Sequence, residues 1–110
     1  MKKFAELQYV RPDMEKIFAR VSGDIAVLKE AKSYEEFRNA YMDYVEADTE
    51  LETSKTVAHV RNTINLLDEF YEAEMVYFNS QMPKYEILKK EMGEVIVASP
   101  FKAEMEKEFG

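Results

Sequence analysis

Apolar residues recur at helical spacing along most of the chain. Behind Pro12 they stand three or four positions apart, the period of one face of an α-helix, and the positions are Met14, Ile17, Phe18, Val21, Ile25 and Leu28. Proline suits the first turn of a helix, where its missing N–H has no partner to lose. The pattern predicts a helix over about 12–31, preceded by an extended N-terminal arm over 1–11. Within this helix Gly23 is either a tolerated glycine or a point of close helix approach.

A second, longer helix is predicted over 34–66. Ser33 and Glu36 have the spacing of a capping box at its start. The apolar stripe behind them consists of Phe37, Ala40, Tyr41, Tyr44 and Leu51. A helix of this span is about 50 Å long, so a bend near 53–56, where hydroxyl-bearing side chains weaken a helix, is the alternative to a straight arm. Asp48 interrupts the stripe, either paired with a basic residue or at its edge.

Three shorter helices are predicted after this, over 68–81, 83–98 and 100–109. Asp68 is a candidate N-cap for the first, Pro83 marks either a kink or a new first turn, and Ser99 with Pro100 fits the start of the last. The last helix carries an apolar stripe for which the sequence shows no partner: Phe101, Met105 and Phe109. The predicted fold is all-α, with three to five antiparallel helices forming a helical hairpin or bundle in a single domain over 12–110.

Length and composition limit the classes of partner. With 110 residues the chain is long enough for one domain. Its 22 acidic and 15 basic residues give a net charge of −7, which repels phosphate and argues against nucleic acid and anionic membranes as partners. No apolar run reaches the length of a membrane span, and no apolar stretch follows Lys2 and Lys3 as it would in a signal peptide. A cytoplasmic location is therefore expected.

The search for catalytic chemistry yields no candidate catalytic, cofactor-binding or metal-binding residue. The chain has one histidine, His59, and no cysteine, whereas an HExxH zinc site needs two histidines four positions apart on one helical face. A di-iron Glu-x-x-His motif is also absent, because Thr56 stands three positions before His59. His59 is interpreted as a packing or surface residue. The chain alone is not expected to be an enzyme.

Two other groups of residues have open interpretations. Alternating acids at Glu46, Asp48, Glu50 and Glu52 point around a helix, which favours a solvated face over an ion site. An arginine close to tyrosines can stack on a ring or hold a carboxylate, and Arg61 stands close in sequence to Tyr71, Tyr77 and Phe78. Composition does not choose between these two roles.

Four sequence strings, in order along the chain, carry a resemblance to a known family. They are Phe4-Ala5-Glu6-Leu7 followed by Tyr9 and Arg11-Pro12-Asp13, Val60-Arg61-Asn62-Thr63-Ile64, Asp68-Glu69-Phe70-Tyr71-Glu72-Ala73-Glu74, and Ala98-Ser99-Pro100-Phe101 with Glu104 to Gly110. Together they resemble the N-terminal helical, non-catalytic region of the oligoendopeptidase F family, the thimet- and neurolysin-like zinc metallopeptidases. The resemblance implies the incomplete N-terminal part of a larger helical enzyme. That enzyme would hydrolyse internal bonds of short peptides, with zinc bound downstream of this region.

The same resemblance implies which partners the chain has. No functional residue of the family falls within these positions, so the chain is expected to be inactive alone and to bind no cofactor itself. Its partner would be the remainder of the peptidase, or a second copy through the exposed apolar stripe Phe101, Met105 and Phe109. Peptides would bind only to the parent enzyme. The alternative is a stand-alone helical protein- or peptide-interaction module from a truncated gene.

Overall fold

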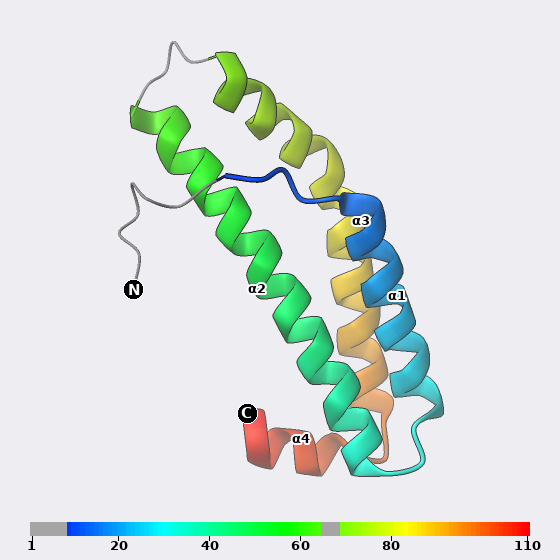
Figure 1. Cartoon of the computed structure of the whole chain (residues 1–110). Helices are drawn as coiled ribbons and strands as arrows, with labels where there is room; N and C mark the ends of the chain where they lie inside the picture. The colour runs from blue at the N-terminus through cyan, green and yellow to red at the C-terminus, as the bar shows by residue number, and fades with distance from the viewer. Residues whose placement is uncertain (1–8, 65–68) are drawn as a thin grey trace.

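A computed structural model describes residues 9–64 and 69–110, and these residues form four α-helices. They are α1 (Met14–Glu30), α2 (Tyr34–Ile64), α3 (Glu69–Ala98) and α4 (Lys102–Phe109). Figure 1 shows α1, α2 and α3 side by side, running down, up and down the molecule in alternation, while α4 crosses the end where α2 begins. The described ranges hold no β-strand. The prediction of an all-α chain with antiparallel helices is therefore confirmed.

The start of α1 differs by two residues from the prediction. Asp13 is the N-cap, and its Oδ1 accepts a hydrogen bond from the backbone N–H of Lys16 at 3.2 Å. An acidic cap satisfies one of the amides that the first turn leaves unpaired, so Pro12 precedes the cap instead of occupying the first helical position. A Cβ added at Gly23 would meet nothing within 4 Å, so this glycine is a tolerated one and does not mark a close helix contact.

The long second helix forms as a single element of 31 residues. Ser33 caps it, with its Oγ accepting the backbone N–H of Glu36 at 3.2 Å, as the capping-box spacing predicts. Figure 1 shows no sharp break at 53–56, where the sequence allowed a bend. The helix extends to Ile64, and the last two residues of the predicted span lie outside the described residues.

A single helix, α3, replaces the two helices predicted on either side of Pro83. It has 30 residues and contains the proline in its interior. Pro83 cannot donate to the carbonyl of Asn79, which removes one bond of the helical ladder, and Figure 1 shows α3 changing direction near its middle. The helix continues because Phe78 and Tyr85, both fully buried, anchor its two halves to the same core. Asp68, the predicted N-cap, lies outside the described residues.

The last helix begins two residues later than predicted. Ser99 does not cap it: the Ser99 Oγ accepts the backbone N–H of Phe101 at 3.0 Å, and the Ser99 carbonyl accepts the N–H of Lys102 at 3.3 Å. Ser99, Pro100 and Phe101 thus form a turn that redirects the chain. The helix starts at Lys102 and lies against the beginning of α2.

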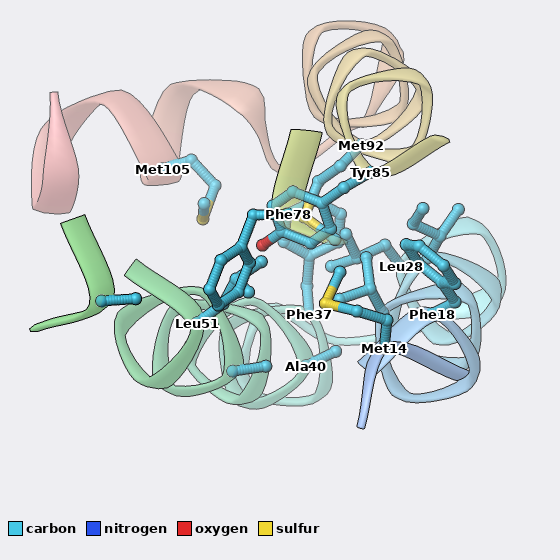
Figure 2. Close-up of a cluster of buried hydrophobic side chains, with 14 residues drawn as sticks. Met14, Phe18, Leu28, Phe37, Ala40, Leu51, Phe78, Tyr85, Met92 and Met105 are labelled. Atoms are coloured by element: carbon cyan, nitrogen blue, oxygen red, sulfur yellow. The ribbon is translucent and has the colours of Figure 1, made fainter. Parts of the chain in front are cut away.

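Side chains from all four helices meet in one apolar core (Figure 2). The largest fully buried members come from three helices and are Met14, Val21, Phe37, Leu51, Phe78 and Tyr85. Burial of this kind contributes roughly 1.5–3 kcal/mol for each large apolar side chain. Past the start of α1, α2 and α3 continue as a two-helix extension (Figure 1).

No helix within residues 9–64 and 69–110 combines the length and the apolar composition that crossing a lipid bilayer requires.

Candidate functional site

The described residues do not provide a metal centre. In ranges 9–64 and 69–110, no three His, Cys, Asp or Glu side chains come together in an arrangement that could hold a metal ion. His59 is exposed on α2, so it occupies a surface position. A catalytic zinc needs three protein ligands around one point, and the described residues do not fit that requirement. Two of the polar clusters between segments distant in sequence contain a buried acid, Glu74 in one and Asp24 in the other.

The first cluster joins the segment before α1 to α3 through the buried carboxylate of Glu74. Glu74 is only 1% exposed. The guanidinium of Arg11 binds both of its oxygens, with Nε 2.9 Å from Oε1 and 3.0 Å from Oε2. The hydroxyl of Tyr9 donates to Oε1 at 2.7 Å. This forked pairing satisfies a buried charge with several hydrogen bonds, which is the condition under which a buried carboxylate is stable.

Aromatic rings enclose the same cluster. The Arg11 guanidinium lies 4.2 Å from the centre of the Tyr77 ring, and the Tyr77 hydroxyl donates to the carbonyl of Pro12 at 3.3 Å. On the other side, the Tyr9 ring packs edge-on against Phe70 and Tyr71, at centroid distances of 6.1 and 5.7 Å. Residues 9–12 therefore form a strap, the segment Tyr9 to Pro12, fastened to the first half of α3.

The electrostatics of the strap follow from these contacts. Hydrogen bonds from Arg11 and Tyr9 hold the pKa of Glu74 below its usual value, against the opposing effect of burial. Burial and the hydrogen bond to Glu74 raise the pKa of Tyr9. Sequence reasoning missed this site because nothing in the pattern separates Glu74 from the other acids of its cluster. The one signal was Arg11 beside Pro12, in the segment predicted to be an extended arm.

The second cluster lies between α1 and α2 around Arg20. Its guanidinium pairs with Asp43, with Nη2 2.8 Å from Oδ1 and Nε 3.1 Å from Oδ2. Nitrogens of the same group are 3.6 Å from Glu46 and 3.6 Å from Glu50. The side chains of Glu46 and Glu50 remain largely exposed, consistent with the solvated acidic face that their alternation predicts. Arg20 thus neutralises part of that face and holds α1 against α2.

Asp24 is buried beside this ion pair and is only partly satisfied. Its Oδ2 has no hydrogen-bond partner among the described residues. Burial, together with a hydrogen bond to Asp43, raises the pKa of Asp24 to about 7. The guanidinium of Arg20 holds the pKa of Asp43 below its usual value. The two carboxyl groups therefore differ in charge below about pH 7, where Asp24 is mostly protonated while Asp43 remains charged.

Asp48, the acid in the apolar stripe of α2, pairs with a tyrosine. The Tyr85 hydroxyl donates to Oδ1 of Asp48 at 2.6 Å, so pairing with a basic residue is not what the structure shows. Tyr85 is fully buried, and its polar end reaches this partner at the half-buried edge of the core. The bond links α2 and α3 across the middle of the molecule.

Of the residues that the sequence grouped with Arg61, only Tyr71 lies beside it. Arg61 Nη1 donates to the Tyr71 hydroxyl at 3.0 Å, and the guanidinium carbon is 5.8 Å from the ring centre. Tyr77 instead contacts Arg11, and Phe78 points into the core. A helix separates residues six or seven positions apart along its axis by about 10 Å, which explains why the three aromatic residues do not form one group.

The apolar stripe of α4 has its partner within the chain, which corrects the expectation that it is exposed. Met105 is 5% exposed. The ring of Phe101 lies 5.4 Å from that of Phe37, and the ring of Phe109 lies 4.9 Å from that of Tyr41. The start of α2 covers the stripe, and only Phe109 retains substantial exposure, 40%. A hollow of about 240 Å³ remains at this corner, between α2, the end of α3 and α4.

Comparisons with known proteins give one consistent result. The family model described as the peptidase M3 N-terminal domain matches residues 4–110. The structure of PZ peptidase A with an inhibitor superposes with a TM-score of 0.93 at 29% identity, covering 98% of this chain and 19% of that one. An oligoendopeptidase F superposes with a TM-score of 0.92 at 30% identity, covering 97% of this chain and 19% of that one. The chain thus spans about a fifth of the length of these two proteins. No curated protein sequence matches it.

Proposed function

Because the chain belongs to the peptidase M3 N-terminal domain family, we propose that it is the non-catalytic N-terminal helical segment of a zinc-dependent oligoendopeptidase. The observation that carries the proposal is the near-complete match of this chain to a small part of two peptidase structures. The parent enzyme would hydrolyse internal bonds of short peptides in the cytoplasm. Zinc and the catalytic residues would come from the part of the parent outside this segment.

The proposed role of the segment is to act as a rigid helical wall. A rigid role requires that the helices keep fixed positions relative to each other. Arg20 with Asp43 joins α1 to α2, Tyr85 with Asp48 joins α2 to α3, and Arg11 with Glu74 joins the strap to α3. These bonds cross helix boundaries, so they resist sliding of one helix along another. None of them requires a ligand.

The shape of the molecule supports a role within a larger protein. The radius of gyration is 16.5 Å, whereas a compact domain of this length would have about 13 Å. The accessible surface is 7471 Å², compared with roughly 6,300 Å² for a compact monomer of this mass. The extents of 51 × 31 × 20 Å describe a flat, elongated body. A body of this shape leaves broad faces that a larger protein could cover.

A second candidate is favoured by one specific observation. The start of α2 covers the α4 stripe, and the core includes side chains of all four helices. A chain that covers its own apolar stripe can be stable as a separate unit. It would then be a stand-alone helical module that binds a protein or a peptide. The absence of catalysis by the isolated chain is common to both candidates.

The deciding experiment is the intact mass of the natural product that contains this sequence, together with peptidase assays. A protein several times larger, with an HExxH motif and zinc-dependent cleavage of short peptides, is the expected result. A natural product of 12.9 kDa would contradict the first candidate and favour the second. Zinc-dependent cleavage by the pure 110-residue chain would contradict both.

A further inference from the structure

The hollow at the corner of α2, α3 and α4 is lined mainly by apolar side chains. They are Tyr41 from α2, Ile96 and Val97 from the end of α3, and Met105 and Phe109 from α4. A hollow beside the strap differs from it, because Asp13, Lys16, Arg20 and Glu50 contribute charged groups to its lining. Figure 1 shows the corner at one end of the bundle, where α4 crosses the start of α2.

Two apolar side chains that line this hollow remain exposed to solvent, because no other part of the described chain covers them. Val97 is 63% exposed and Phe109 is 40% exposed. Single exposed apolar residues are normal on protein surfaces. Here, however, apolar groups from three helices meet around one concavity, and such grouped surfaces characterise interaction sites.

The rim of the hollow has the polarity of an interface. Lys102 and Glu106 line it, with Nζ 3.8 Å from Oε1. An apolar centre with charged groups at the edge is the usual arrangement where two protein surfaces meet. Since both signs of charge occur at the rim, the surface favours a polypeptide over a phosphate-rich partner.

We propose that this hollow receives an apolar side chain from the catalytic remainder of an M3-type peptidase, and that Val97 lies at the centre of the contact. The inference rests on the proposed function. The occupant follows from the size of the relatives: this chain matches 19% of each of the two peptidase structures, so about four-fifths of their polypeptide is available to cover its faces. The hollow offers an apolar side chain of that polypeptide a lining that comes mainly from apolar groups of three helices.

The test uses a chimera in which residues 4–110 replace the matched fifth of PZ peptidase A. Val97→Arg is introduced into the chimera and into the isolated chain. Arginine is chosen because a cation near the C-terminus of α3 does not oppose the helix dipole. The matched control is Val76→Arg, which makes the same change on the same helix at a position that is 65% exposed and outside the hollow.

We expect the Val97→Arg substitution to have different effects in the isolated chain and in the chimera. In the isolated chain both variants keep the melting temperature within about 3 °C of the parent, as exposed substitutions do. In the chimera Val97→Arg lowers the melting temperature by about 5 °C or more, because the charge enters an apolar contact, and Val76→Arg leaves it unchanged. Peptidase activity of the chimera falls in parallel with the loss of folded protein.

Three outcomes would overturn the inference. They are a chimera that does not fold although the isolated chain melts cooperatively, a chimera that tolerates Val97→Arg as well as Val76→Arg, and an equal loss of stability from Val97→Arg in the isolated chain. The proposed function fails differently, through the mass and activity of the natural product. If the mass or activity of the natural product contradicts the proposed function, the chimera still measures whether the hollow contacts the remainder of a peptidase.

Discussion

Arg11 and Glu74 form a forked ion pair across 63 positions of sequence, and the carboxylate of that pair is almost completely buried. The contact converts the segment before α1 into a strap that holds the first half of α3. The Tyr9 hydroxyl and the Tyr77 ring complete the enclosure. A surface ion pair contributes little to stability, whereas removal of one partner from a buried one leaves an unsatisfied group. Glu74 therefore provides a direct test of how much the strap stabilises the fold.

Glu74→Gln is expected to lower the free energy of unfolding by about 1–3 kcal/mol, because the amide cannot accept all the bonds from Arg11 and Tyr9. Urea denaturation at pH 7 measures this change. Glu72→Gln, an exposed position on the same helix, is the control and should stay within about 0.5 kcal/mol of the parent. Equal stability of the two variants would show that the strap does not hold α3.

The same carboxylate predicts a loss of stability in acid. Its pKa is lower in the folded chain than in the unfolded one, so it stabilises the fold above the ordinary glutamate value of about 4.3 and loses this contribution as pH falls through its folded pKa. The difference in stability between the parent and Glu74→Gln should therefore narrow below about pH 4. A difference that stays constant from pH 7 to pH 3 would contradict this assignment.

Asp24 should show the opposite dependence on pH. Burial raises its pKa to about 7, so its contribution to stability is largest below its unfolded pKa of about 4 and is lost as pH rises toward 7. Asp24→Asn removes the titration while keeping the shape. Against the parent, it should be more stable at pH 8, by on the order of 1–3 kcal/mol, and similar at pH 4. Thermal melts at the two pH values measure the effect.

Asp43→Asn is the matched comparison for Asp24. Arg20 lowers the pKa of Asp43, so its charge stabilises the fold and its removal should reduce stability at pH 8. If Asp24→Asn raises the stability at pH 8 and Asp43→Asn lowers it, the two neighbouring carboxyl groups have different charge states. A change of stability in the same direction for both variants would contradict this difference in charge.

Tyr85→Phe tests the bond between α2 and α3. It removes the hydroxyl that donates to Asp48 at 2.6 Å and keeps the buried ring, so the expected loss is about 0.5–1.5 kcal/mol in chemical denaturation. Tyr41→Phe is the control, because the Tyr41 ring packs on Phe109 while its hydroxyl makes no hydrogen bond within the described residues. A larger loss from Tyr41→Phe than from Tyr85→Phe would argue against a role for the bond.

Gly23→Ala and Gly93→Ala should each raise stability, by about 0.5–1 kcal/mol, because alanine restricts the unfolded chain and favours the helix. An added Cβ meets nothing within 4 Å at either position. Gly110→Ala is the contrasting change, since its Cβ would lie 2.5 Å from the Glu106 carbonyl oxygen. Calorimetric melting measures the stability of each of the three variants. A loss of stability in Gly23→Ala would mean that another part of the protein covers the helix surface at this position.

The helical periodicity was sufficient to predict the all-α fold and the long second helix, because caps and apolar stripes are local properties of the chain. Ser33 is an example: its spacing to Glu36 predicts the cap that the structure contains. Pro83 shows where local reasoning leaves two alternatives open, a kink or a new first turn, and the structure has the proline inside one helix. A proline disfavours the helix interior, but Phe78 and Tyr85 on either side are buried in one core, and tertiary packing outweighs the lost hydrogen bond.

The polar clusters were less accessible to prediction, for a different physical reason. With 22 acidic residues in the chain, most carboxylates remain in water, and only the three-dimensional fold decides which ones are buried. Asp24 stands beside Ile25 within the buried face of α1, and Glu74 meets Arg11 only because the strap crosses α3. The burial of either residue depends on contacts between distant segments, which spacing along one helix does not report.

The unequal lengths of the helices imply that the chain does not open as one unit. α1 has 17 residues, whereas α2 and α3 have 31 and 30. Among residues 9–64 and 69–110, no third helix covers the end of the α2–α3 pair beyond α1, and the strap is what holds it. Backbone amides near Arg61 and Tyr71 should exchange with solvent deuterium through small, frequent openings. Those near Leu51 and Tyr85 should exchange only when the whole domain unfolds. Hydrogen exchange would thus divide this helical pair into a slowly exchanging base and a rapidly exchanging tip, with the Arg11–Glu74 pair at the boundary.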